Sequence, residues 1–169
     1  MILRRGTSAD VGFLGLMMRE AGFPPARRPP LDEALRAPHV AQWLDGWGRD
    51  GDLAILAVDD GGALLGAAWC RRFGSDGFPN YGFVDHATPI LAIAVDEPHR
   101  GRGIGAALLA ALAAAAGDAG APALSLSVGP SNRARRLYER TGFVHVADAP
   151  NGQLVMRLPL SPPREPYGC

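Results

Sequence analysis

The chain has 169 residues, a mass of 17.8 kDa and a formal net charge of zero, from 17 basic and 17 acidic residues. This length suits one domain with a continuous core and leaves little room for two. The balanced charge excludes a global electrostatic field that would recruit nucleic acid or an anionic membrane, so any anion site must be local.

The cysteines and the apolar segments predict a soluble protein of a reducing compartment. Cys70 lies in a strand-like run and Cys169 is the last residue, which gives neither a disulfide framework nor a metal-ligand spacing. Gly and Asp interrupt the apolar-rich start, and the Ala-rich run 106–116 is too short to cross a bilayer. We therefore expect a cytoplasmic protein.

The first half of the chain predicts one strand, three helices and a hairpin. A short strand over 2–5 is followed by Thr7 or Ser8 as a helix N-cap and by a helix to about Glu20. The proline-rich segment 22–30 cannot form regular helix. Beyond it the pattern predicts helices over 31–36 and 40–47, then strands over 53–58 and 63–71 around a turn at 59–62.

The second half predicts a long loop and then alternating strands and helices. The loop 73–87 combines Gly, Pro and Asn with aromatic residues, and its length is typical of a functional loop. The following strand, 89–95, is apolar on both faces and hence central. Helices over 103–117 and 131–140 alternate with strands over 124–128, 143–146 and 154–158. We expect one domain over 1–160 and a flexible tail over 161–169.

The strongest functional signal follows the predicted central strand. Three glycines, Gly101, Gly103 and Gly105, alternate where a helix begins, and they let main-chain N–H groups approach a diphosphate closely. The first helical turn directs its unpaired donors and its dipole at the same anion. Arg100 and Arg102 add charge-assisted donors. The segment therefore predicts a phosphate-binding cradle.

Two alternatives compete with the cradle. The glycines could serve only the sterics of a tight strand-to-helix turn. Gly101, Gly103 and Ala106 also satisfy the dinucleotide pattern G-x-G-x-x-A, but this pattern requires an acidic residue about 20 positions later. The sequence there, SLSVGPSN, contains no carboxylate, and the chain left after it is too short for a doubly wound fold.

Two segments together resemble the GNAT acetyltransferase superfamily. HRGRGIGAALL is similar to that family's R/Q-x-x-G-x-G/A pyrophosphate motif, with Arg100, Gly103 and Gly105 in the defining positions. SNRARRLYERTGF resembles its later motif, in which an Asn at a helix start precedes Leu-Tyr-Glu and Gly-Phe. The resemblance is specific over about 88–146 and loose before it.

The resemblance implies an α/β fold, α+β in some schemes. Its sheet is mixed, mostly antiparallel and twisted, flanked by helices, with a central parallel strand pair that splays apart. The coenzyme's pantetheine arm would lie between the strands predicted over 89–95 and 124–128. Acetyl-CoA is then the expected cosubstrate, bound by the strand residues Ile93, Ala94 and Val95 and by the cradle residues Arg100, Gly101, Arg102, Gly103, Ile104, Gly105 and Ala106. An unpaired strand amide can complete its hydrogen bonding with the ligand and hold an oxyanion.

The implied reaction is direct attack of a primary amine on acetyl-CoA through a tetrahedral intermediate. Tyr138 matches the position of the family's proton donor, and Asn132 matches its coenzyme-contacting asparagine. Arg135 follows Asn132 closely in the sequence and could reach the nucleotide end of coenzyme A. The plainer interpretations are a packing aromatic for Tyr138, a helix cap for Asn132 and a solvated arginine for Arg135.

The general base is the least determined part of the site. Asp85 and His86 precede the central strand and are the candidates, with a solvated loop pair as the alternative. The histidines show no metal spacing, so no metal is expected. The acceptor, a small-molecule or peptide amine, would bind between 22–48 and 73–87, which carry Trp43, Trp47, Phe78, Tyr81 and Phe83.

Partners and alternatives complete the expectations. No nucleic acid or membrane partner is expected, and the oligomeric state stays open, a homodimer included. The alternative function is a coenzyme A-binding regulatory or interaction protein without turnover.

Overall fold

The computed structural model describes residues 1–74 and 79–161. Its helices are α1 (Val11–Gly22), α2 (Leu31–Arg36), α3 (Pro38–Leu44), α4 (Ile104–Asp118) and α5 (Ala134–Arg140), with 3₁₀ turns η1 (Ser8–Asp10), η2 (Pro25–Arg27) and η3 (Glu97–His99). Its strands are β1 (Ile2–Arg5), β2 (Leu53–Val58), β3 (Leu64–Arg71), β4 (Ile90–Val95), β5 (Ala123–Val128), β6 (Val144–Asp148) and β7 (Leu154–Pro159). Within these ranges, no helix combines the length and apolarity that crossing a bilayer requires.

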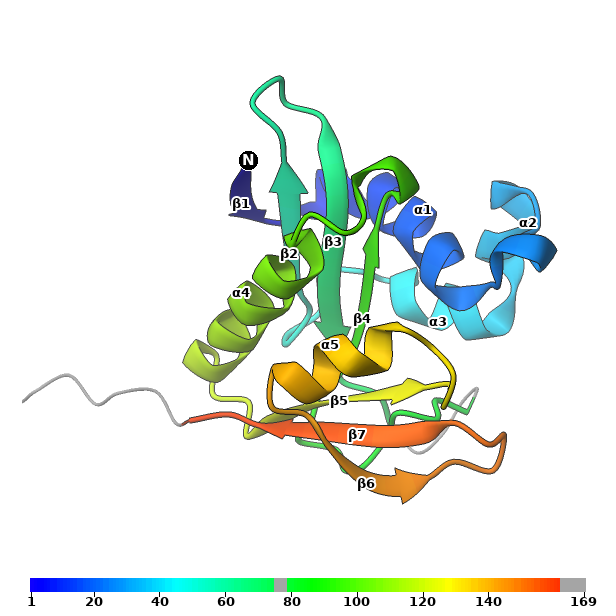
Figure 1. Cartoon of the computed structure of the whole chain (residues 1–169), viewed down its shortest axis with the longest axis vertical. Helices are drawn as coiled ribbons and strands as arrows, with labels where there is room; N and C mark the ends of the chain where they lie inside the picture. The colour runs from blue at the N-terminus through cyan, green and yellow to red at the C-terminus, as the bar shows by residue number, and fades with distance from the viewer. Residues whose placement is uncertain (75–78, 162–169) are drawn as a thin grey trace, which may run out of the picture.

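The strands form one seven-stranded sheet in the order β1-β2-β3-β4-β5-β7-β6. Strands β4 and β5 are parallel, and the other neighbouring pairs are antiparallel. Figure 1 shows β5, β7 and β6 running across the direction of β2, β3 and β4, so the sheet turns sharply where β4 meets β5. The predicted mixed, mostly antiparallel sheet with a central parallel pair is confirmed.

Helices bury both faces of this sheet. Helix α4 covers one face, and α1 and α3 cover the other. Because successive side chains of a strand point to opposite faces, Ile55 joins the cluster under α4 while its neighbour Leu56 joins Leu14 and Trp43 under α1 and α3. The strands that carry the site are therefore packed on two sides.

Most predicted elements are confirmed, some with shifted ends. The strand over 53–58 and the helix over 31–36 have the predicted bounds, whereas the helix predicted over 40–47 is α3, Pro38–Leu44. Helix α5 begins at Ala134 and not at 131, because the Asn132 side chain accepts the Ala134 N–H (2.9 Å) and closes a turn there. Phe78 and residues 162–169 of the predicted tail lie outside the described residues.

A buried ion pair fastens the α3 end of the helical layer to the sheet. Arg71, on β3, donates from Nε and Nη2 to the two carboxylate oxygens of Asp52 at 2.9 and 2.7 Å. Their side chains are 1 % and 3 % exposed. The remaining Arg71 nitrogen, Nη1, donates to the carbonyls of Gln42 and Asp45, and the guanidinium lies 5.4 Å from the Trp47 ring centre. Both charges are thus fully engaged.

We predict that Asp52→Asn lowers the free energy of unfolding by about 3–5 kcal/mol, because it leaves a buried guanidinium without its counter-charge. Urea denaturation of the purified protein measures the change. Asp32→Asn is the matched control, since Asp32 pairs with Arg36 at 3.0 Å but both side chains are 71 % exposed, and it should cost less than about 0.5 kcal/mol. Equal losses in the two variants would contradict the prediction.

Candidate active site

The sheet opens between its two parallel strands. Beta-ladder pairing joins β4 and β5 at one position, Ile90 with Ser125. The Asp96 N–H, just past β4, donates to the carbonyl of Leu65 on β3. Since N–H directions alternate along a strand, the amides of Ile93 and Val95 point the other way, into the opening. The Ala94 amide lies on the β3 side, so the main chain of the predicted strand residues is divided between the two sides.

The connection from β4 into α4 runs over residues 96–103 and contains η3, and residues 104–106 form the first turn of α4. Gly101 and Gly103 have φ of +76° and +79°, a region that favours glycine. A Cβ at either position would meet nothing within 4 Å, so backbone conformation and not packing requires glycine there. The first helical hydrogen bond runs from Ala107 to Gly103, which leaves the N–H groups of residues 104–106 without intrahelical acceptors. With the helix dipole behind them, these donors suit an anion.

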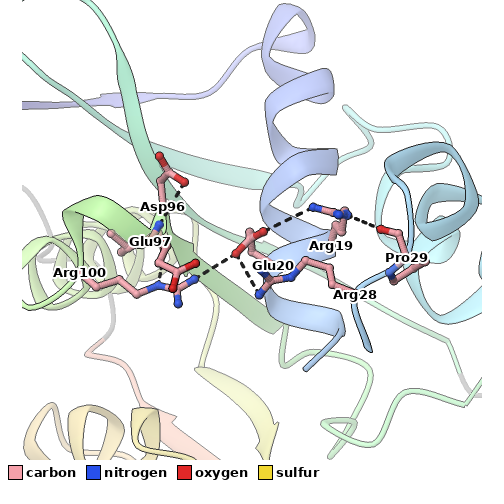
Figure 2. Close-up of polar contacts among 8 residues, drawn as sticks. Arg19, Glu20, Arg28, Pro29, Asp96, Glu97 and Arg100 are labelled. Atoms are coloured by element: carbon pink, nitrogen blue, oxygen red, sulfur yellow. Dashed lines mark hydrogen bonds and ion pairs between the residues drawn. The ribbon is translucent and has the colours of Figure 1, made fainter. Parts of the chain in front are cut away.

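Arg100 holds this turn against its neighbours. Its Nε donates to the Val95 carbonyl at 2.9 Å, on the side of β4 that faces the opening. Its Nη2 donates to Glu20 of α1 at 3.1 Å (Figure 2). The side chain is 43 % exposed. Arg100 therefore fixes the loop and retains further donors, while Arg102 is exposed beside it.

Tyr138 lies on α5, on the α4 side of the sheet. It is 8 % exposed within the same cluster as Leu126, and its ring centre lies 5.7 Å from that of Phe143. Burial raises the pKa of Tyr138 to about 12. The phenol therefore stays protonated at neutral pH and can serve only as a proton donor there.

Asn132 and Arg135 are engaged at the start of α5. The Asn132 side chain accepts the Ala134 N–H, which is the cap that the sequence allowed for. Arg135 pairs with Glu139 at 2.7 Å one helical turn on, and their side chains are 42 % and 45 % exposed. Both residues remain at the surface, where a ligand could reach them.

The described part of the predicted loop reaches the opening between β4 and β5 from the α1 side. A Cβ on Gly82 would lie 2.7 Å from the Ile90 side chain and 3.1 Å from the Ser127 nitrogen, so the loop backbone packs directly on both strands. The His86 ring packs edge-on against Phe83, with ring centres 5.3 Å apart. This part of the loop forms one wall at the opening.

Asp85 is occupied by its own turn. Its carboxylate accepts the N–H groups of Ala87 and Thr88 at 2.9 and 2.8 Å and the Thr88 hydroxyl at 3.0 Å. Burial acts to raise the pKa of Asp85, but the hydrogen bonds from Thr88 and Ala87 outweigh it and the pKa lies below its usual range. A carboxylate of lowered pKa is a weak base.

Two polar residues near the cradle were not singled out from the sequence. Glu20 lies in the last turn of α1 and contacts Arg100, and Arg28 contacts the same Glu20 oxygen at 3.1 Å (Figure 2). A contact between positions 20 and 100 has no periodic signal, so the sequence alone could not pair them. Among residues 1–74 and 79–161, no three His, Cys, Asp or Glu side chains come together as a metal site would need.

Comparison with known proteins gives a family and a fold. The sequence matches the acetyltransferase (GNAT) family over residues 17–143, more than half of the chain. No curated protein matches it significantly. Solved structures similar to it include a ribosomal-protein-alanine N-acetyltransferase from Brucella melitensis, with 24% identity, TM-score 0.68 and 95% of this chain and 100% of that one covered.

Two further structures show the same likeness. An N-acetyltransferase from Staphylococcus aureus Mu50 is 21% identical, with TM-score 0.69 and coverage of 95% of this chain and 98% of that one. A GNAT superfamily phosphinothricin acetyltransferase from Sinorhizobium meliloti, in complex with acetyl-CoA, is 22% identical, with TM-score 0.65 and coverage of 98% and 95%. At these identities the likeness establishes the shared fold.

The cradle glycines should respond differently to alanine. Gly103→Ala forces a side chain into left-handed backbone, and we predict a loss of about 1–2 kcal/mol in the free energy of unfolding. Gly105 lies in α4, where an added Cβ would be 3.4 Å from Leu137, so Gly105→Ala should raise it by about 0.5–1 kcal/mol. Urea denaturation measures the free energy of unfolding of the two variants. Equal changes of the same sign would contradict the different backbone conformations assigned to Gly103 and Gly105.

Proposed function

The chain belongs to the GNAT acetyltransferase family, and we propose that it transfers the acetyl group of acetyl-CoA to a primary amine of a small molecule or of a protein N-terminus. The observation that carries the proposal is the alignment of two sets of unpaired amides. One set lies along β4 at the opening and the other begins α4, with Arg100 fixed between them.

The two sets of amides fit the two parts of coenzyme A. The amide-containing pantetheine arm pairs with the main chain of Ile93 and Val95, completing a ladder that β5 leaves open. The diphosphate takes the free N–H groups of residues 104–106 at the positive end of α4. Arg102, exposed beside this turn, adds a charged donor.

The chemistry needs one oxyanion donor and two proton transfers. The amine nitrogen bonds to the acetyl carbon, and a β4 amide facing the opening stabilises the oxyanion that forms there. The carbon–sulfur bond then breaks, and the Tyr138 hydroxyl gives its proton to the departing thiolate. The attacking nitrogen loses a proton to a base, and the carbonyl re-forms as the carbon–sulfur bond breaks, which leaves the amide product and free coenzyme A.

His86 is the better candidate for that base. Asp85 has its lone pairs committed to Ala87 and Thr88 and a lowered pKa. The exposed His86 ring lies on the loop whose Gly82 packs against Ile90 and β5. The amine would accordingly approach from the α1 side of the sheet, opposite the α4 and α5 side that holds Tyr138.

The proposed acceptor class rests on the substrates of two structural neighbours and on the charge of this chain. One structural neighbour acts on a ribosomal protein's alanine and another on phosphinothricin, so both peptide and small-molecule amines belong in the test. The chain's own balanced charge favours neither a polycation nor a nucleic acid.

The experiment is a thiol-release assay with acetyl-CoA over a panel of peptide N-termini and small amines. We predict turnover for at least one class, and a fall in kcat of about 100-fold or more in Tyr138→Phe, since this variant keeps the ring and removes only the acidic proton. Tyr167→Phe, at a tyrosine that the proposal assigns to no part of the site, is the matched control and should retain full activity.

The outcomes separate the alternatives. An unchanged rate in Tyr138→Phe would remove Tyr138 as the acid. Stabilisation by acetyl-CoA on heating without thiol release from any amine would favour the coenzyme-binding regulatory or interaction protein.

The pH profile gives a further prediction. A primary amine of pKa near ~10.4 is mostly protonated at neutral pH, so kcat/KM should rise from pH 7 to 9 as the neutral amine grows. Because burial raises the pKa of Tyr138 to about 12, the acid stays protonated over this range. An alkaline fall between pH 8 and 9 that disappears in Tyr138→Phe would contradict the raised pKa of Tyr138, although it would support Tyr138 as the acid.

A further inference from the structure

One carboxylate joins the cradle to the segment that precedes α2. Glu20, near the end of α1, accepts a hydrogen bond from Arg100 on Oε2 at 3.1 Å, and the same oxygen forms an ion pair with Arg28 Nη2 at 3.1 Å. Its other oxygen lies 3.7 Å from Arg19 Nη1. Figure 2 shows Glu20 between Arg100 on one side and Arg19 and Arg28 on the other. Glu20 is thus a shared partner of elements far apart in sequence.

The Arg28 end of this arrangement is buried and depends on Glu20. The side chains of Arg28 and Glu20 are both 13 % exposed. The Arg28 Nε is buried and has no hydrogen-bond partner among the described residues, so the contact with Glu20 is the polar anchor of this guanidinium. Arg19 adds a second tie, since its Nε donates to the Pro29 carbonyl at 2.6 Å. Segment 25–30 is therefore held to α1 by polar contacts.

The Arg100 end belongs to the coenzyme site. Its Nε is fixed on the Val95 carbonyl, and Gly101 follows it in the chain. The guanidinium is 43 % exposed and so remains open to an anion. A diphosphate at the cradle and Glu20 would then compete for the same group, because both are negatively charged acceptors.

We propose that Glu20 is a positioning residue that couples segment 25–30 to coenzyme A binding. While Glu20 Oε2 is also paired with Arg28, it neutralises the charge of Arg100 only in part, and Arg100 can donate hydrogen bonds to the diphosphate. When Arg28 is lost or drawn away, Glu20 is left to Arg100 and weakens the cradle. By thermodynamic reciprocity, coenzyme binding also changes the hold on segment 25–30. The inference rests on the proposed function, which supplies the coenzyme.

The test is a double-mutant cycle read by calorimetric titration with coenzyme A, so it needs no knowledge of the acceptor. Arg28→Gln should raise the dissociation constant about threefold to tenfold in the wild-type background. In the Glu20→Gln background, the same change should alter it less than about twofold, because its route to Arg100 is gone. Arg27→Gln is the matched control, since Arg27 is the exposed neighbour with the same charge.

Arg27→Gln should change the dissociation constant less than about twofold in both backgrounds. If Arg28→Gln raised the dissociation constant equally with and without Glu20, the coupling would be overturned, and the change would be explained by the loss of one positive charge. A wild-type protein that binds no coenzyme A would overturn the proposed function as well. Thermal melts of the four proteins of the cycle confirm that each is folded. Arg28→Lys keeps the positive charge and one donor to Glu20, so its dissociation constant for coenzyme A should lie within about twofold of the wild-type value. A larger change with a folded protein would count against the coupling.

Discussion

Strands β4 and β5 lie together at the centre of the sheet but share one ladder position, Ile90 with Ser125. Main-chain donors along an open edge cannot be buried without partners, since each would cost about as much as a lost hydrogen bond. The opening persists because β4 is paired along its length with β3, and β5 with β7. Each strand keeps its full ladder on one edge, and because the two halves of the sheet run across each other (Figure 1), their other edges diverge beyond Ile90. The fold therefore leaves strand amides unpaired where the pantetheine arm of the coenzyme is proposed to bind.

The two faces of the sheet divide the proposed chemistry. The α4 and α5 side contributes the helix N-terminus and Tyr138, and the opposite side contributes the loop around Gly82 and the segment between α1 and α2. In the proposed reaction, the proton donor and the incoming amine would therefore lie on opposite sides of the reacting carbon. Glu20 and Arg100 form a polar link between the two sides, and the Arg71–Asp52 pair keeps α3 fixed beneath the acceptor side.

The sequence predicted the fold well because its signals are local. The apolar run 53–58 and the glycines at 101–105 each determine a conformation from neighbouring residues, and both appear as expected. The site was predicted less completely. Asp85 was one of two candidates for the base, with a solvated loop pair as the alternative, and its spacing to Thr88 lets it accept hydrogen bonds within its own turn. Glu20 was missed because its partner is 80 residues away in the sequence, and tertiary contacts of that kind follow from packing alone.

The tryptophans provide an optical label for one side of the molecule. The sequence contains three, and all of them, Trp43, Trp47 and Trp69, pack in the cluster under α1 and α3, with none under α4. Intrinsic fluorescence therefore originates on the side from which the amine is proposed to approach. An emission change on adding an amine would report that face directly, whereas occupancy of the helix N-terminus alone would leave the spectrum nearly unchanged.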